Sequence, residues 1–173
     1  FFASSRYWTI DRRAVGACTH DGSRASDDVM HPASSLRLTM QPTGKDKIQV
    51  YYARMINRTL FNRGVGPTTT PDASLYQTTP IGYNALTKWT STVSNKLLLD
   101  ASFIMTMVHP KLAPQPFVTA DPSIIAKRDL TTGVSYDAAA TQTDFYDQKG
   151  SAQGSAAQVT GADSCKDGVQ YGP

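Results

Sequence analysis

Polar and apolar residues alternate with a period of two in several stretches, and this alternation constrains the fold more than any other feature. Residues 97–107 show it most clearly. One side of an extended chain would carry Leu97, Leu99, Ala101, Phe103, Met105 and Met107, and the other Leu98, Asp100, Ser102, Ile104 and Thr106. A helix would scatter the same residues around its circumference, because it repeats every 3.6 residues. The stretch is therefore predicted to be a strand with one apolar and one mixed face.

The same reasoning along the chain predicts about seven strands, an all-β fold and a single domain over residues 1–173. The predicted strands cover 1–10, 34–41, 47–57, 80–91, 96–107, 151–159 and 164–171. One face of the sheet should carry Leu36, Leu38, Met40, Ile48, Val50, Leu97, Leu99 and Phe103. The opposite face should carry Arg37, Gln49 and Asp100.

The connections between these strands alternate in length. Short connections at 42–46, 92–95 and 160–163 are rich in turn residues, and long ones rich in Pro, Gly, Ser and Thr occupy 11–33, 58–79 and 108–150. A compact soluble domain rarely tolerates three long structureless loops. A transmembrane barrel joins its strands in this way, with short turns on one side of the membrane and long loops on the other. The sequence therefore predicts an antiparallel up-and-down meander that is part of a transmembrane β-barrel.

Composition is compatible with this prediction and narrows the alternatives. Charged residues make up 18% of the chain, below the roughly 25% of an average soluble domain. The apolar runs are too short for a transmembrane helix. A net charge of +3 on dispersed basic residues argues against a nucleic-acid partner.

Aromatic residues lie near predicted strand ends, where barrels place interfacial girdles; they are Tyr7, Trp8, Tyr52, Tyr83 and Trp89. The alternative is a soluble β-sandwich, a binding or adhesion module in which these aromatics would belong to the core.

Three stretches carry a family resemblance: "SLRLTMQPTGKDKIQVYY" (35–52), "KWTSTVSNKLLLDASF" (88–103) and "VTGADSCKDGVQYG" (159–172). They resemble the barrel of TonB-dependent outer-membrane receptors, and specifically the Oar-like subgroup with an N-terminal carboxypeptidase-regulatory-like domain. The resemblance runs from about residue 1 to 172 and rests on turns and strand starts. Two positions depart from the family pattern, because Cys165 replaces an apolar residue and Asp167 a small apolar one.

The resemblance implies transport across the outer membrane. A full receptor would bind a bulky extracellular solute and admit it past a plug domain, driven by the TonB system. Outer-membrane lipid, the plug and the TonB system are thus the implied partners, and the ligand is unknown. The plug and the N-terminal domain are not recognisable in this chain. Both ends look cut, so the chain is expected to be a fragment of the barrel.

The cysteines test the predicted arrangement. Cys18 lies in the first long connection, and Cys165 follows the last short turn. The two should therefore lie at opposite rims of an apolar band about 25 Å tall, too far apart for a disulfide. Cys165 is expected to behave as a small buried hydrophobe.

Catalytic, cofactor and metal sites are not predicted. His20, His31 and His109 are widely separated and belong to no metal-binding motif. No nucleophile elbow or phosphate-binding loop is present. The segment "HDGSRASDD" (20–28) gathers three Asp, but it lacks the spacing and terminal Glu of a calcium-binding EF-hand loop. An enzyme is the weakest hypothesis, and the sequence indicates no ligand-binding residue.

Overall fold

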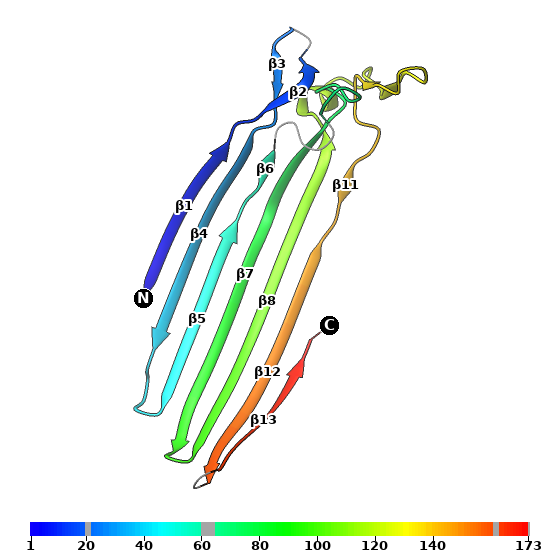
Figure 1. Ribbon diagram of the computed structural model, residues 1–173. Helices are drawn as coiled ribbons and strands as arrows, with labels where there is room; N and C mark the ends of the chain where they lie inside the picture. Colours follow the sequence, from blue (N-terminus) through cyan, green and yellow to red (C-terminus); the bar gives the residue numbers. More distant parts are fainter. Residues whose placement is uncertain (20–21, 60–64, 161–162, 173) are drawn as a thin grey trace.

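The computed structural model describes residues 1–19, 22–59, 65–160 and 163–172, and it is all-β (Figure 1). Nearly all of its regular structure is strand, with one short helix, α1 (Pro116–Thr119), among the described residues. Within this part of the chain no helix has the length and apolar character that crossing a membrane would require. The prediction of an all-β, antiparallel fold is confirmed.

Seven long strands form one sheet, and each of the seven predicted strands corresponds to one of them. They are β1 (Phe2–Ile10), β4 (Val29–Met40), β5 (Asp46–Met55), β7 (Leu75–Ser94), β8 (Leu97–Pro114), β12 (Asp147–Thr160) and β13 (Asp163–Tyr171). Their order in the sheet is their order in the chain, and every neighbouring pair is antiparallel. The predicted up-and-down meander is therefore confirmed.

The shortest of these strands have 9 residues and the longest 20. β7 and β8 extend beyond the predicted ends, through Pro80 and Pro110. Proline removes a backbone donor and predicts a strand end. Here the register between β7 and β8 shifts between Thr78 and Ile81, so an irregularity beside Pro80 lets the pairing continue past it.

Among the described residues, the tight turns between β4 and β5 and between β7 and β8 lie at one end of the sheet, and the long connections lie at the other (Figure 1). We call these the turn end and the loop end. The long connections carry local structure that the sequence did not predict. This comprises β2 (Arg13–Cys18), β3 (Arg24–Ser26), β6 (Arg58–Thr59), β9 (Lys127–Arg128), β10 (Ser135–Tyr136), β11 (Thr143–Asp144) and α1. β2 pairs with β3 and β9 with β10, whereas β6 and β11 extend the main sheet at its loop end.

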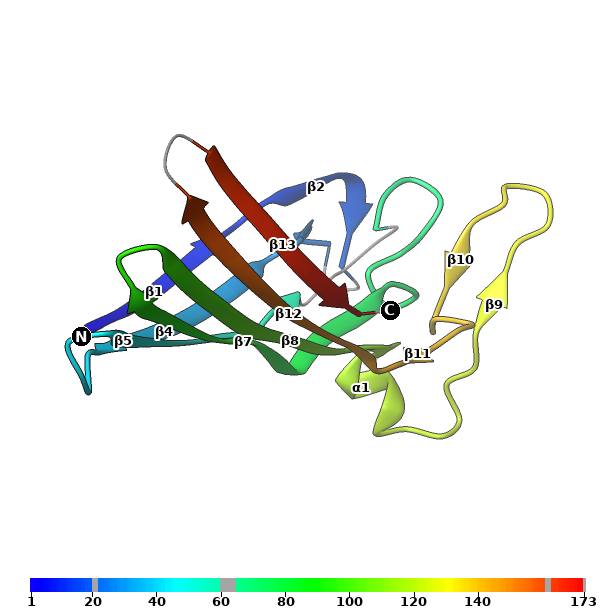
Figure 2. The same ribbon diagram turned by 90° about the horizontal axis from the view of Figure 1, so that it is seen from below.

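The sheet is curled and open, with β1 and β13 as the ends of its strand order (Figure 2). The elements in substantial contact with one another are all hydrogen-bonded neighbours, so within the described residues no second layer packs across the long strands.

Few large apolar side chains are buried. The apolar residues with buried side chains among those described are Ala17, Ala25, Ala53, Pro71, Ala73, Val118 and Ala138. Several of them, with the buried Gln115 and Ser74, lie in the long connections or at the loop end, where Gln115 Nε2 donates to Ser74 Oγ at 3.0 Å. A chain of this length normally covers its Leu, Ile and Phe side chains in a core. Here the long strands leave much of their apolar surface uncovered.

Candidate functional site

The pairing of the strands sorts their side chains onto two faces, which we call the apolar face and the polar face. The apolar face carries the predicted set from Leu36 to Phe103, since residues paired across an antiparallel ladder point the same way. One row of directly paired residues across this face is Leu38, Val50, Thr87, Phe103, Ala152 and Tyr171. Met40 and Phe103 are 50% and 49% exposed. The predicted shared face is confirmed, and it is uncovered.

The polar face lies one residue away along each strand. The adjacent row there is Thr39, Gln49, Lys88, Ser102, Gln153 and Gln170, polar on every strand from β4 to β13. Arg37 and Asp100 share this face, as predicted. These two rows thus differ in polarity across the six long strands from β4 to β13, while elsewhere the polar face also carries Leu98 and Ile104.

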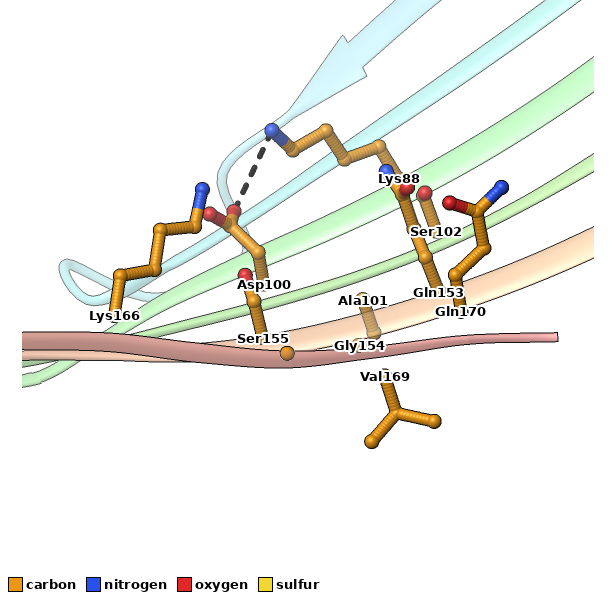
Figure 3. Close-up of a pocket in the computed structure, with 11 residues that line it drawn as sticks. Lys88, Asp100, Ala101, Ser102, Gln153, Gly154, Ser155, Lys166, Val169 and Gln170 are labelled. Carbon is orange, nitrogen blue, oxygen red and sulfur yellow. Dashed lines mark ion pairs between the residues drawn. The ribbon is translucent and has the colours of Figure 1, made fainter.

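A pocket on the polar face places Asp100 among polar groups from four strands (Figure 3). Its side chains come from β7, β8, β12 and β13. Lys88 Nζ lies 3.5 Å from Asp100 Oδ1, and Thr90 Oγ1 donates to the same oxygen at 2.6 Å. Lys166 also acts electrostatically on this carboxylate. In Figure 3 the polar side chains rise on one side of the sheet, whereas Val169 points to the other. Asp100 can therefore interrupt an apolar run, because its neighbours Leu99 and Ala101 face the opposite way.

The aromatic residues divide between the faces. Tyr7, Tyr52, Tyr83 and Trp89 lie on the apolar face. Tyr52 and Tyr83 stack with ring centroids 6.1 Å apart, and Trp89 Nε1 donates to Asp46 Oδ1 at 3.2 Å.

Trp8 lies near the end of β1, as predicted, but on the other face from these four aromatic residues. Trp8 is paired with His31 on the polar face, and the two ring centroids are 4.2 Å apart. Adjacent residues of a strand point to opposite faces, so Tyr7 and Trp8 lie on different faces of β1.

The two cysteines lie near opposite ends of the sheet, as predicted, and both are free thiols (Figure 1). Cys18 ends β2 at the loop end, and Cys165 lies in β13 near the turn that joins it to β12. The expected burial of Cys165 is wrong, because the residue is exposed. It lies on the apolar face of the edge strand β13, where none of the described residues covers it.

A polar cluster at the loop end was not predicted. His109 Nε2 contacts Asp144 Oδ1, and Lys111 Nζ lies 3.0 Å from Asp144 Oδ2. Tyr146 stacks on the His109 ring with centroids 3.6 Å apart. The contact with His109, and then that with Lys111, holds the pKa of Asp144 below its usual value. These contacts hold β11 against β8, although His109 and Asp144 are 35 residues apart in the sequence. No local sequence motif predicts them.

No metal-binding group emerges from the described residues, since no three His, Cys, Asp or Glu side chains lie together there in a suitable arrangement. His31 is stacked on Trp8 and His109 is engaged by Asp144. His20 and Asp21, part of the acidic segment 20–28, lie outside the described residues.

Comparisons with protein-family models, with curated proteins and with solved structures found no match to this chain. The features of the molecule that bear on its function are therefore the two faces of the sheet and the arrangement of its connections.

Proposed function

We propose that the chain is part of the transmembrane β-barrel of an outer-membrane transport protein, of the kind that its sequence resembles: a TonB-dependent receptor of the Oar-like subgroup. The apolar face would contact outer-membrane lipid, and the polar face would line the interior of the barrel. The loop end would face the outside of the cell. In a complete receptor, a plug domain and the TonB system would be the partners in uptake of a bulky solute.

The observation that carries the proposal is the uncovered apolar face. Burying apolar surface is the dominant favourable contribution to folding, and about 25 cal/mol is lost for each Å² left in water. An exposed row such as Leu38, Val50 and Phe103 therefore needs a cover. Lipid is a cover that fits strands of 9 to 20 residues, since about 9–11 residues cross a bilayer.

The position of the connections supports the same proposal. Short turns at one end and long, locally structured connections at the other are typical of outer-membrane barrels. The alternative of a soluble β-sandwich needs a second sheet over Leu38 and its neighbours. The described residues supply no such sheet, so this alternative lacks support.

A matched pair of cysteine variants tests the proposal. In a background with Cys18→Ser and Cys165→Ser, Leu38→Cys and Thr39→Cys place a thiol on opposite faces of β4. Each would be labelled with a small fluorophore and the chain inserted into phosphatidylcholine vesicles. We expect a nitroxide on the lipid chains to quench the label at 38 much more than the label at 39, and aqueous iodide to show the reverse order. Equal quenching at the two positions by both agents would contradict a lipid-facing apolar face.

A further inference from the structure

Charge is distributed unevenly between the two faces. On the polar face the cations are Arg6, Arg37, Lys47, Lys88, Lys149 and Lys166, and the carboxylates are Asp100 and Asp147. On the apolar face of the same strands, Arg54 and Lys111 are balanced by Asp46 and Asp167. The polar face therefore carries most of the excess positive charge of the long strands.

This positive charge is only partly neutralised. Asp100 is paired with Lys88 at 3.5 Å, and Asp147 with Lys149 at 3.2 Å. Arg6, Arg37 and Lys47 make no ion pair within the described part of the chain. All three are exposed.

The free cations follow one another across the first three long strands. Arg6 on β1 is paired with Ala33, four residues from Arg37 on β4. Arg37 is paired with Tyr51, four residues from Lys47 on β5. At about 3.3 Å per residue, successive cations are displaced along the strands by roughly 13 Å. They form an extended stripe across the face rather than a point site for a small ion.

The groups beside this stripe indicate which kind of anion fits. Thr39 and Gln49 adjoin the stripe on β4 and β5, and their row continues away from it across the polar face through Ser102, Gln153 and Gln170. Amides both donate and accept hydrogen bonds, as a polypeptide does, whereas phosphate oxygens only accept. We propose that the polar face binds an acidic polypeptide, with Arg6, Arg37 and Lys47 contacting its carboxylates. The inference rests on the charge and hydrogen-bonding groups of this face and does not require that the apolar face meets lipid.

Charge reversal on matched positions of the sheet tests this inference. Binding of fluorescein-labelled poly-L-glutamate to the full chain in a neutral detergent would be followed by anisotropy at low ionic strength. We expect the double variant Arg37→Glu, Lys47→Glu to bind about tenfold more weakly, because it removes two attractions and adds two repulsions of modest size.

The single variants Lys47→Glu and Arg54→Glu change the charge of β5 by the same amount, but on opposite faces of the sheet. Only Lys47→Glu should weaken binding, by about threefold. An equal loss in Arg54→Glu would overturn the inference in favour of attraction to net charge.

A measurement on the unaltered chain keeps the test independent of variant folding. Bound poly-L-glutamate should protect Lys47 and Lys88 from acetylation, with little protection of Lys127 in the long connection, as read by mass spectrometry. No protection of Lys47 would refute the proposal. So would tighter binding of inorganic polyphosphate with the same dependence on Lys47, since the face would then select a phosphate polymer instead of a polypeptide.

Discussion

Two neighbouring rows of the sheet, one residue apart on every strand, have opposite chemistry. The row through Val50 and Phe103 is largely apolar and exposed, and the row through Gln49 and Ser102 is polar throughout. In a soluble domain with one covered face, the apolar row would be buried and the polar row would meet water. Here the described part of the chain places no second layer over either row. The alternation of polar and apolar residues therefore specifies two different environments, and the described residues supply neither of them.

The largest expected effect comes from placing a charge on the apolar row. We predict that Val50→Arg destabilises the chain in lipid vesicles by about 2–4 kcal/mol, because the side chain lies midway along β5 and would face hydrocarbon. Gln49→Arg, one residue away on the polar face, should change the stability by less than about 0.5 kcal/mol. Urea unfolding in the presence of lipid measures both. Equal costs would abolish the distinction between the two rows.

A second pair of variants compares backbone packing at two glycines of the sheet. A Cβ at Gly82 would lie 2.5 Å from the carbonyl oxygen of Met55, whereas a Cβ at Gly154 would meet its nearest atom only at 3.9 Å. We therefore expect Gly82→Ala to cost about 1–3 kcal/mol, as overpacking does. Gly154→Ala should be nearly neutral, and the midpoints of unfolding of the two variants give the comparison. A neutral Gly82→Ala would mean that β5 and β7 separate easily at this point.

The polar face can be tested at Asp100. Asp100→Ala removes the acceptor of Thr90 and the partner of Lys88, and we predict a loss of about 1 kcal/mol. Ser102→Ala on the same face and strand is the control and should cost less. If the loss at Asp100 is no greater than that of the control, the polar cluster contributes nothing measurable to stability.

The smallest expected effect concerns the loop end, where pH should act on the attachment of β11 to β8. The folded chain holds the pKa of Asp144 below its ordinary 3.8, mainly through the hydrogen bond with His109. A depressed pKa means that the stabilisation is fully present above 3.8 and is lost as pH falls through the lower folded value. Amide exchange near Thr143 should therefore accelerate below pH 3.8 relative to that of the central strands. Asp144→Asn should remove this difference, and its persistence in the variant would assign the effect to another group.

Much of the fold could be predicted from the sequence, because burial and exposure impose a period of two on strands. Stretches such as 35–41 and 97–107 determine which strands form, which face each residue takes and how neighbours pair. The alternation of connection lengths then placed Cys18 and Cys165 at opposite ends correctly.

The remaining features depend on contacts that no local pattern records. The His109–Asp144 contact joins residues 35 apart in the chain, and the strand extensions past Pro80 and Pro110 depend on a register shift between β7 and β8. The distance of Trp8 from a strand end does not show which face it occupies, because adjacent residues of β1 alternate between the two faces. The exposure of Cys165 depends on whether another part of the molecule covers the apolar face of β13, and the sequence of β13 does not indicate this.

The order of the long strands limits how the open sheet could be closed into a cylinder. Each of the seven long strands runs in the opposite direction to the long strand before it, so β1 and β13 point the same way, from the turn end to the loop end. Antiparallel neighbours could close this sheet into a cylinder only if an odd number of further strands stood between β13 and β1. Two copies of the chain with the same orientation cannot complete such a cylinder by themselves. In that case β13 of one copy would lie parallel to β1 of the other. Any partner that closes the sheet must therefore place strands antiparallel to both β1 and β13.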